Sequence, residues 1–191
     1  MARVVVLLAE GFEEIEAITP IDYLRRAGVQ VETVAVPVGG KADPLVIGAH
    51  KIPVKADMTF DELAMREGGL PDGVFVPGGM PGATHLAAHQ GLRSELWNHN
   101  NKGGHVAAIC ASPAIVLAPL GIITGRNAVC YPGMEKGVSG VKWGASRVAV
   151  DSNVVTGNGP ASAMDFALKL VEISAGEETA RAVADGMLFF R

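Results

Sequence analysis

The sequence predicts a doubly wound α/β sandwich, in which a mostly parallel sheet carries helices on both faces. Several short runs are apolar at every residue and rich in valine and isoleucine, which is typical of strands covered on both sides. Segments with apolar residues at helical spacing separate these runs. This alternation indicates βαβ units, and proteins of this class receive ligands at the carboxyl ends of their strands.

Strands and helices can be placed in order along the chain. Strands are expected at residues 3–9, 29–36, 73–77, 105–110, 127–131 and 154–156. Helices are expected at residues 13–27, 92–101, 113–120 and 161–175. Two hairpins are expected at residues 45–54 and 147–156, where short polar or glycine-containing segments interrupt apolar runs. With no internal repeat and no low-complexity linker, one domain over residues 1–191 is expected.

Length and composition narrow the possible functions. A chain of 191 residues, 49% hydrophobic and 19% charged, suits one domain whose core needs no metal or disulfide. The net charge is −4, and the chain has only two Trp and two Tyr residues. There is therefore no basic stripe and no stacking platform, and nucleic acid is not expected as a partner.

No apolar run has the length of a membrane span or a signal-peptide core. The N-terminal run holds six apolar residues before Glu10, and no later run is long enough to cross a bilayer. Cys110 and Cys130 lack metal-site spacing and are expected to remain reduced thiols. We expect a cytoplasmic protein without membrane contact.

Cys110 is the main candidate for chemistry. It follows an apolar run and precedes a helix start, with Ser112 as the expected cap and Pro113 at the first helical position. Ala108 and Ser112 are small, as a nucleophile elbow requires. Unpaired N–H groups and the helix dipole should favour the thiolate. The alternative, that Cys110 is one more small buried apolar residue, stays open on this stretch alone.

Three glutamates lie near the start of the first expected helix. The helix dipole favours negative charge there, and this end stabilisation explains Glu13 and Glu14. Glu16 lies between Ile15 and Ile18, on the side of the helix expected to face the sheet. We therefore expect a partly buried Glu16 carboxyl that needs a partner.

Glycine-rich and histidine-containing segments give no cofactor or metal site. Gly78 and Gly79 follow a strand, but the Gly-Lys-Ser/Thr of a phosphate loop is absent. His85 and His89 are four residues apart on an expected helix without a third ligand, which favours a solvated helix face over a zinc site. The other three histidines, His50 among them, belong to no constellation. Neither a cofactor nor a metal is expected.

Four motifs together resemble the ThiJ/PfpI superfamily, and within it the branch of the parkinsonism-associated protein deglycase and its bacterial relatives. They occupy residues 8–16, 76–79, 107–113 and 159–168, in order over nearly the whole chain. The resemblance implies a flavodoxin-like fold of the class I glutamine amidotransferase-like kind, usually a homodimer. It also implies a reactive cysteine at Cys110, a partner carboxyl at Glu16, and oxyanion-binding amides at Gly79 and Ala111, with Gly78 beside them.

Two departures from the superfamily pattern bear on activity. Ala111 follows the cysteine where the protease branch has a histidine within reach, so peptidase activity is not expected. Tyr131 precedes Pro132 where many relatives of the deglycase branch have a histidine. Tyr131 either donates a hydrogen bond to the substrate or only packs, and acid–base work falls to Glu16.

The residues and the resemblance together predict a cysteine-dependent glyoxalase or deglycase-like enzyme. Its substrates would be small reactive aldehydes such as methylglyoxal, or their glycated adducts, and it would need no cofactor. The alternative is a redox-sensing or chaperone-like stress-response protein that works through oxidation of Cys110. Ile15, Ile18, Ile21 and Leu24 give the first helix more apolar surface than one sheet covers, so a homodimer is expected.

Overall fold

A seven-stranded sheet forms the centre of the computed structural model, which describes residues 3–40, 43–65 and 71–189. The strand order is β10-β11-β7-β6-β1-β2-β5. All neighbours pair in parallel except β10, which is antiparallel to β11. The strands are β1 (Arg3–Leu8), β2 (Gln30–Ala35), β5 (Met58–Thr59), β6 (Gly73–Val76), β7 (His105–Ile109), β10 (Val148–Asp151) and β11 (Val154–Gly157).

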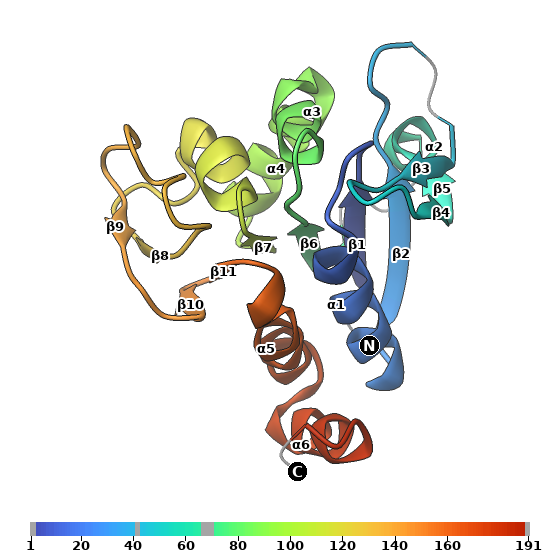
Figure 1. The fold of residues 1–191 in the computed structure, drawn as a ribbon, viewed down its shortest axis with the longest axis vertical. Helices are drawn as coiled ribbons and strands as arrows, with labels where there is room; N and C mark the ends of the chain where they lie inside the picture. Colours follow the sequence, from blue (N-terminus) through green and yellow to red (C-terminus); the bar gives the residue numbers. More distant parts are fainter. Residues whose placement is uncertain (1–2, 41–42, 66–70, 190–191) are drawn as a thin grey trace.

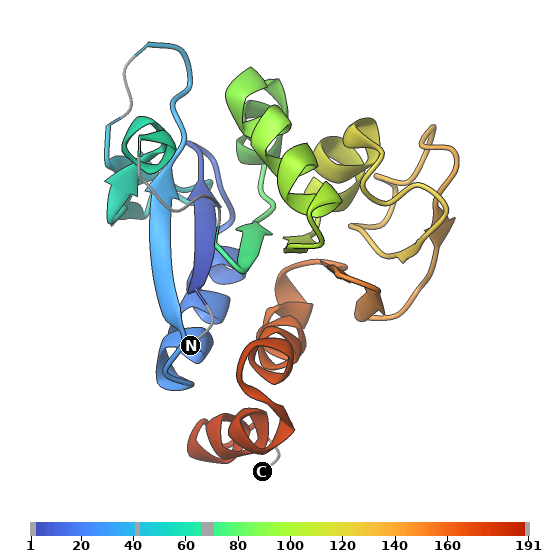
Figure 2. The ribbon, with the colours of Figure 1, turned by 180° about the vertical axis from the view of Figure 1, so that it is seen from behind.

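Helices cover both faces of this sheet, as the continuous apolar strands predict. In Figure 1, α5 and α6 lie on the opposite side of β6, β7 and β11 from α3 and α4, and Figure 2 shows the same arrangement from behind. The helices are α1 (Glu14–Arg26), α2 (Phe60–Ala64), α3 (Gly82–Ala88), α4 (Gln90–Asn101), α5 (Ala163–Ala175) and α6 (Glu177–Gly186). Three short turns of other helix types are η1 (Pro113–Leu117), η2 (Ala118–Leu120) and η3 (Pro160–Ser162).

Alternate residues of each strand divide between two cores. Val4, Val6 and Leu8 of β1 pack with α1 and α5, whereas Val5 and Leu7 pack with the helices of the other face. Because both sets of side chains are buried, β1 is apolar at every position after Arg3. The doubly wound, mostly parallel flavodoxin-like fold predicted from the sequence is confirmed.

Two small sheets lie outside the main one. The expected hairpin at residues 45–54 is confirmed as β3 (Leu45–Ile47) paired antiparallel with β4 (Pro53–Lys55). The strand expected at residues 127–131 was wrong in extent. Only β8 (Asn127–Ala128) forms there, and it pairs with β9 (Lys142–Trp143). The chain leaves β8 because the next amides bond elsewhere, such as Val129 N–H to Thr156 Oγ1 at 2.9 Å.

The orientation predicted for α1 was also wrong in part. Ile15 and Ile18 are 54% and 41% exposed, while Glu16 is completely buried. The buried face includes Ile21 and Leu24, so the sheet covers only part of the apolar surface of this helix. Hydrophobic spacing alone identified the helix but not which apolar residues it leaves to solvent.

The segment after Cys110 is not the expected α-helix over residues 113–120. It consists of the π-helical turn η1 followed by the 3₁₀ turn η2. Ser112 makes no cap hydrogen bond, and its hydroxyl instead donates to Pro77 O at 2.6 Å. Several elements were not predicted from the sequence, namely α2, α6, β5 and β9.

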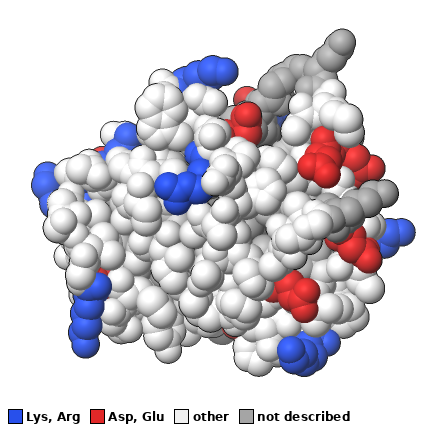
Figure 3. All heavy atoms as spheres, turned by 90° about the horizontal axis from the view of Figure 1, so that it is seen from above, with Lys and Arg blue, Asp and Glu red and all other residues white. Residues whose placement is uncertain are grey.

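The surface visible from above carries charged residues that are scattered over an otherwise uncharged face (Figure 3). Within the described residues, no helix is both long enough and apolar enough to cross a membrane.

Candidate active site

The candidate site lies where the turns after β1, β6 and β7 meet, at the carboxyl ends of these strands. Backbone and side-chain hydrogen bonds join the three turns. Glu13 N–H donates to Gly78 O at 3.0 Å, and the Ser112 hydroxyl joins the β7 turn to Pro77 in the β6 turn. Cys110 N–H donates to Gly157 O at the end of β11, at 2.9 Å. The two strands that flank β7, β6 and β11, therefore both hold the turn that carries Cys110.

Cys110 has the strained backbone of a nucleophile elbow. Its φ is 62°, a left-handed value that non-glycine residues rarely adopt. Such strain persists only where the surroundings impose it, and it is concentrated at functional sites. The side chain is partly exposed, whereas the neighbouring Ile109 and Ala111 are buried. The turn thus leaves the thiol partly exposed at a strand end whose neighbouring residues are buried.

The Glu16 carboxyl lies beside this thiol with no solvent exposure. Its Oε2 accepts the Gly78 N–H at 3.0 Å, and its Oε1 has no hydrogen-bond partner among the described residues. A Cβ on Gly78 would lie 2.5 Å from both Cys110 Cβ and Glu16 Oε2. Glycine at this position therefore lets the carboxyl and the thiol approach each other.

Burial controls the charge of this pair. Desolvation raises the pKa of Glu16 to about 7, although its interactions with Cys110 and Gly78 N–H oppose the increase. Burial also raises the pKa of Cys110 to about 12, and the neighbouring Glu16 charge adds to this, while the amides of Gly79 and Ala111 lower it. The thiolate expected from the sequence therefore stays a prediction, since the amides of Gly79 and Ala111 favour it while desolvation and a charged Glu16 oppose it.

Glu16 and Cys110 consequently titrate as a pair. Between pH 7 and pH 12 the pair holds one proton and one negative charge. When the proton is on Glu16, the repulsion that opposes the thiolate is absent. The two pKa values therefore belong to the pair rather than to either residue.

A pocket of about 560 Å³ opens above the cysteine. Gly79, Cys110, Ala111 and Tyr131 line it, whereas Gly78 and Glu16 are not among its lining residues. The structure thus places four of the predicted site residues on the pocket wall and the other two behind it. The volume is in the range of small-molecule sites.

Tyr131 belongs to this wall through its backbone as well as its ring. Its N–H donates to Cys110 O at 2.8 Å, and a Cβ on Gly159 would lie 3.3 Å from the ring. The side chain is 46% exposed. Its hydroxyl makes no hydrogen bond within the described part of the chain, so the phenol group is free to contact a ligand.

His50 was missed by sequence reasoning, which assigned it to no constellation. It lies in the turn of the β3–β4 hairpin and lines the Cys110 pocket with Glu13 and Glu14. Its Nδ1 lies 2.9 Å from Glu14 Oε2, and its N–H donates to Glu14 Oε1 at 2.8 Å. The hairpin motif was visible in the sequence, but its contact with α1 was not.

The histidines give no strong case for a metal site. Ligand atoms of Glu13, Glu14 and His50 lie within 4.8 Å of one another, but the Glu14 oxygens already bind His50 and the hairpin backbone. His85 belongs to α3, whereas His89 lies at the start of α4 and accepts the Leu92 N–H at 3.1 Å. The single helix face expected for His85 and His89 is therefore wrong.

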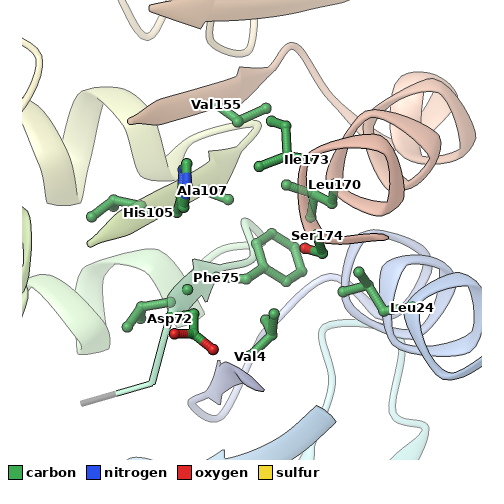
Figure 4. A pocket seen from close by; sticks show the side chains of 13 residues that line it. Val4, Leu24, Asp72, Phe75, His105, Ala107, Val155, Leu170, Ile173 and Ser174 are labelled. Carbon is green, nitrogen blue, oxygen red and sulfur yellow. The ribbon is translucent and has the colours of Figure 1, made fainter. Parts of the chain in front are cut away.

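A second cavity lies at the opposite ends of the strands (Figure 4). Val4, Phe75 and Ala107 contribute side chains from β1, β6 and β7, and Leu170 closes it from α5. Its volume is about 50 Å³, far below that of ordinary ligand sites. It represents imperfect packing of the core and not a competing active site.

Known proteins share this architecture. The DJ-1/PfpI family matches residues 2–173. The Parkinson disease protein 7 homolog of Danio rerio is 36% identical over 184 residues, covering 95% of this chain and 94% of that protein. The glutathione-independent glyoxalase DJR-1.2 of Caenorhabditis elegans is 32% identical over 180 residues, with 93% and 90% covered.

Other relatives extend the comparison. The oxidized structure of Toxoplasma gondii DJ-1 superposes with a TM-score of 0.90 at 37% identity, covering 100% of both chains. The chain spans only 39% of the longer DJ-1 homolog B of Arabidopsis thaliana, to which it is 34% identical over 92% of its own length. The chain belongs to the DJ-1/PfpI family.

Proposed function

We propose that this protein is a cysteine-dependent glyoxalase or deglycase-like enzyme that converts small reactive carbonyls such as methylglyoxal, or their glycated adducts, without a cofactor. The observation that carries this proposal is the contact of a buried carboxyl with a nucleophilic thiol beneath an open pocket. Cys110 and Glu16 form that pair, and the amides of Gly79 and Ala111 face the sulfur. A relative named as a glutathione-independent glyoxalase supports the same chemistry.

The reaction begins from the state with a thiolate and a protonated carboxyl. The Cys110 sulfur forms a bond to the aldehyde carbon, and the carbonyl electron pair moves onto oxygen, where the two amides stabilise it. The new alkoxide takes the proton of Glu16. This proton transfer leaves a hemithioacetal beside a carboxylate.

The carboxylate then works as a base. It removes the proton from the carbon bonded to sulfur and returns a proton to the neighbouring carbon, whose ketone oxygen becomes a hydroxyl. The hydroxyl on the first carbon loses its proton as the thioester carbonyl forms. Water hydrolyses this lactoyl thioester to lactate and frees Cys110. The net change is the addition of one water to methylglyoxal.

A second candidate function is redox sensing through Cys110. The amides that face its sulfur would stabilise an oxidised, negatively charged cysteine, and a relative has been studied in an oxidized form. Redox sensing and aldehyde turnover would both use the Cys110 thiol.

We also propose a homodimer. Ile15 and Ile18 present apolar surface on α1 that no described part of the chain covers, and Ile15 lies at the pocket rim. A second copy that buries this surface would border the active site.

Lactate formation tests the proposed enzyme. Wild-type protein with methylglyoxal and a chelator, but no glutathione, should form lactate, and Cys110→Ala should not. Cys130→Ala is the matched control, since Cys130 lies outside the pocket yet also faces a carboxyl, with its Sγ 3.9 Å from Glu135 Oε2. The proposal would be contradicted if wild-type protein formed lactate no faster than buffer alone, or if Cys110→Ala formed it at the wild-type rate.

A further inference from the structure

A carboxylate holds His50 in one orientation at the pocket wall. Glu14 is buried, and its Oε1 accepts two amides of the hairpin, from His50 at 2.8 Å and from Ile52 at 3.4 Å. Its Oε2 accepts the Nδ1–H of the imidazole at 2.9 Å, a tautomer assigned because an ionised carboxylate can only accept. The other ring nitrogen, Nε2, remains for a ligand, and the His50 side chain is 67% exposed.

Such an arrangement is how proteins prepare a histidine for acid–base work. An imidazole anchored through one nitrogen by a carboxylate exchanges protons through the other nitrogen. His50 and Cys110 line one pocket, although they come from distant parts of the sequence. The sequence has Tyr131 where the resemblance implies a histidine, but the structure brings another imidazole to the pocket from the β3–β4 hairpin.

The reaction proposed above needs a proton carrier that Glu16 does not provide. In the proposed hemithioacetal, the first carbon is bonded to the Cys110 sulfur, which Glu16 contacts from behind the pocket wall. The second carbon and its oxygen then have only the pocket to occupy. Glu16 has no surface there, because it is completely buried. We propose that His50, oriented by Glu14, is the catalytic acid–base residue for this second oxygen, an inference that rests on the proposed function.

The proton transfers balance with His50 in this role. As Glu16 removes the proton from the first carbon, the His50 imidazolium donates its Nε2 proton to the ketone oxygen of the second carbon. The neutral imidazole then takes the hydroxyl proton of the first carbon when the thioester carbonyl forms. His50 returns to its starting state, and no oxidant or reductant takes part.

The charges around His50 favour its protonated form. The hydrogen bond to Glu14 raises the pKa of the imidazole, and the charge of Glu13 adds to this. Burial opposes the charge of Glu14, but hydrogen bonds from His50 and the backbone keep its pKa low. Cys110 and Tyr131 are the titratable groups that face His50 across the pocket, and Lys51 adjoins it in the turn.

Replacing His50 with asparagine tests this role. Asparagine can keep the hydrogen bond from the Nδ1 position to Glu14 but has no Nε2. We expect kcat for lactate formation to fall about a hundredfold, as general acid–base residues contribute. The loss of rate at high pH that marks deprotonation of His50 should also disappear. Cys110 alkylation by iodoacetamide should continue at the wild-type rate, which would show that the thiol site is intact.

His85→Asn is the matched control. His85 is also anchored through Nδ1, which lies 2.8 Å from Glu10 O, but it lies outside the pocket. This variant should keep the wild-type kcat and pH profile. A wild-type rate and pH profile in His50→Asn, with Cys110→Ala inactive, would overturn the role of His50 alone. If wild-type protein forms no lactate, both proposals are overturned. If a chelator abolishes the activity, His50 acts as a metal ligand and not as an acid–base residue.

Discussion

Replacing Glu16 with glutamine should change the pH dependence of folding stability. The pKa of this carboxyl is raised from about 4.5 to about 7 in the folded protein, mainly by desolvation. Between these two values the unfolded chain loses the proton before the folded protein does. Glu16 therefore contributes stability at pH 4 that is lost as the pH rises through 7. The difference of about 2.5 pKa units corresponds to a loss of about 3 kcal/mol.

Glutamine has nearly the same volume and keeps an oxygen for Gly78 N–H, but it cannot ionise. Its buried NH₂ group carries a cost of about 1–3 kcal/mol that does not depend on pH. The informative quantity is therefore the change in unfolding free energy of each protein between pH 4.5 and pH 8. Urea unfolding under reducing conditions should show wild type losing about 3 kcal/mol more than Glu16→Gln over this range. Equal losses in the two proteins would refute the buried, protonated carboxyl.

Four further outcomes are expected. Glu16→Gln should lower the pKa of Cys110 by about 1–3 units, measured as the pH dependence of iodoacetamide alkylation, because a neighbouring negative charge is removed. Gly78→Ala should reduce lactate formation at least about tenfold, because the new Cβ overlaps the thiol and the carboxyl, and a normal rate would exclude this contact. Ser112→Ala should lower the unfolding free energy in urea by about 1–3 kcal/mol, because Pro77 O loses its buried donor; no change would mean that water replaces it. Mild peroxide should add two oxygens to Cys110 by intact mass, whereas oxidation confined to methionines would count against the redox alternative.

Those features that depend on local pattern could be predicted from the sequence. Continuous apolar runs identified the buried strands because strands covered on both faces need no polar side. The small residues around Cys110 identified the turn after β7, since strand and helix backbones approach closely there. Glu16 was proposed as a buried partner because it lies between Ile15 and Ile18, on the side of the helix expected to face the sheet, even though those isoleucines proved to be exposed.

Features that depend on contacts between distant segments could not be predicted. The desolvation that raises the pKa of Cys110 arises from the packing of three separate turns, which no local pattern records. The pairing of His50 with Glu14 joins the β3–β4 hairpin to α1 and is equally invisible in the sequence. Ser112 looked like a helix cap because residue type and position fitted, but its hydroxyl donates to Pro77 O in a distant turn and accepts no helix N–H.

The covalent intermediate on Cys110 gives the most direct test of the proposed chemistry. Wild-type protein can be mixed with methylglyoxal, quenched in acid during turnover and digested for peptide mass analysis, since acid preserves a thioester while a hemithioacetal dissociates. A lactoyl group is expected on the peptide that contains Cys110, absent from Cys110→Ser and appearing no more slowly than lactate. Lactate formed without this thioester, or adducts found only on arginine and lysine side chains, would contradict the proposed chemistry.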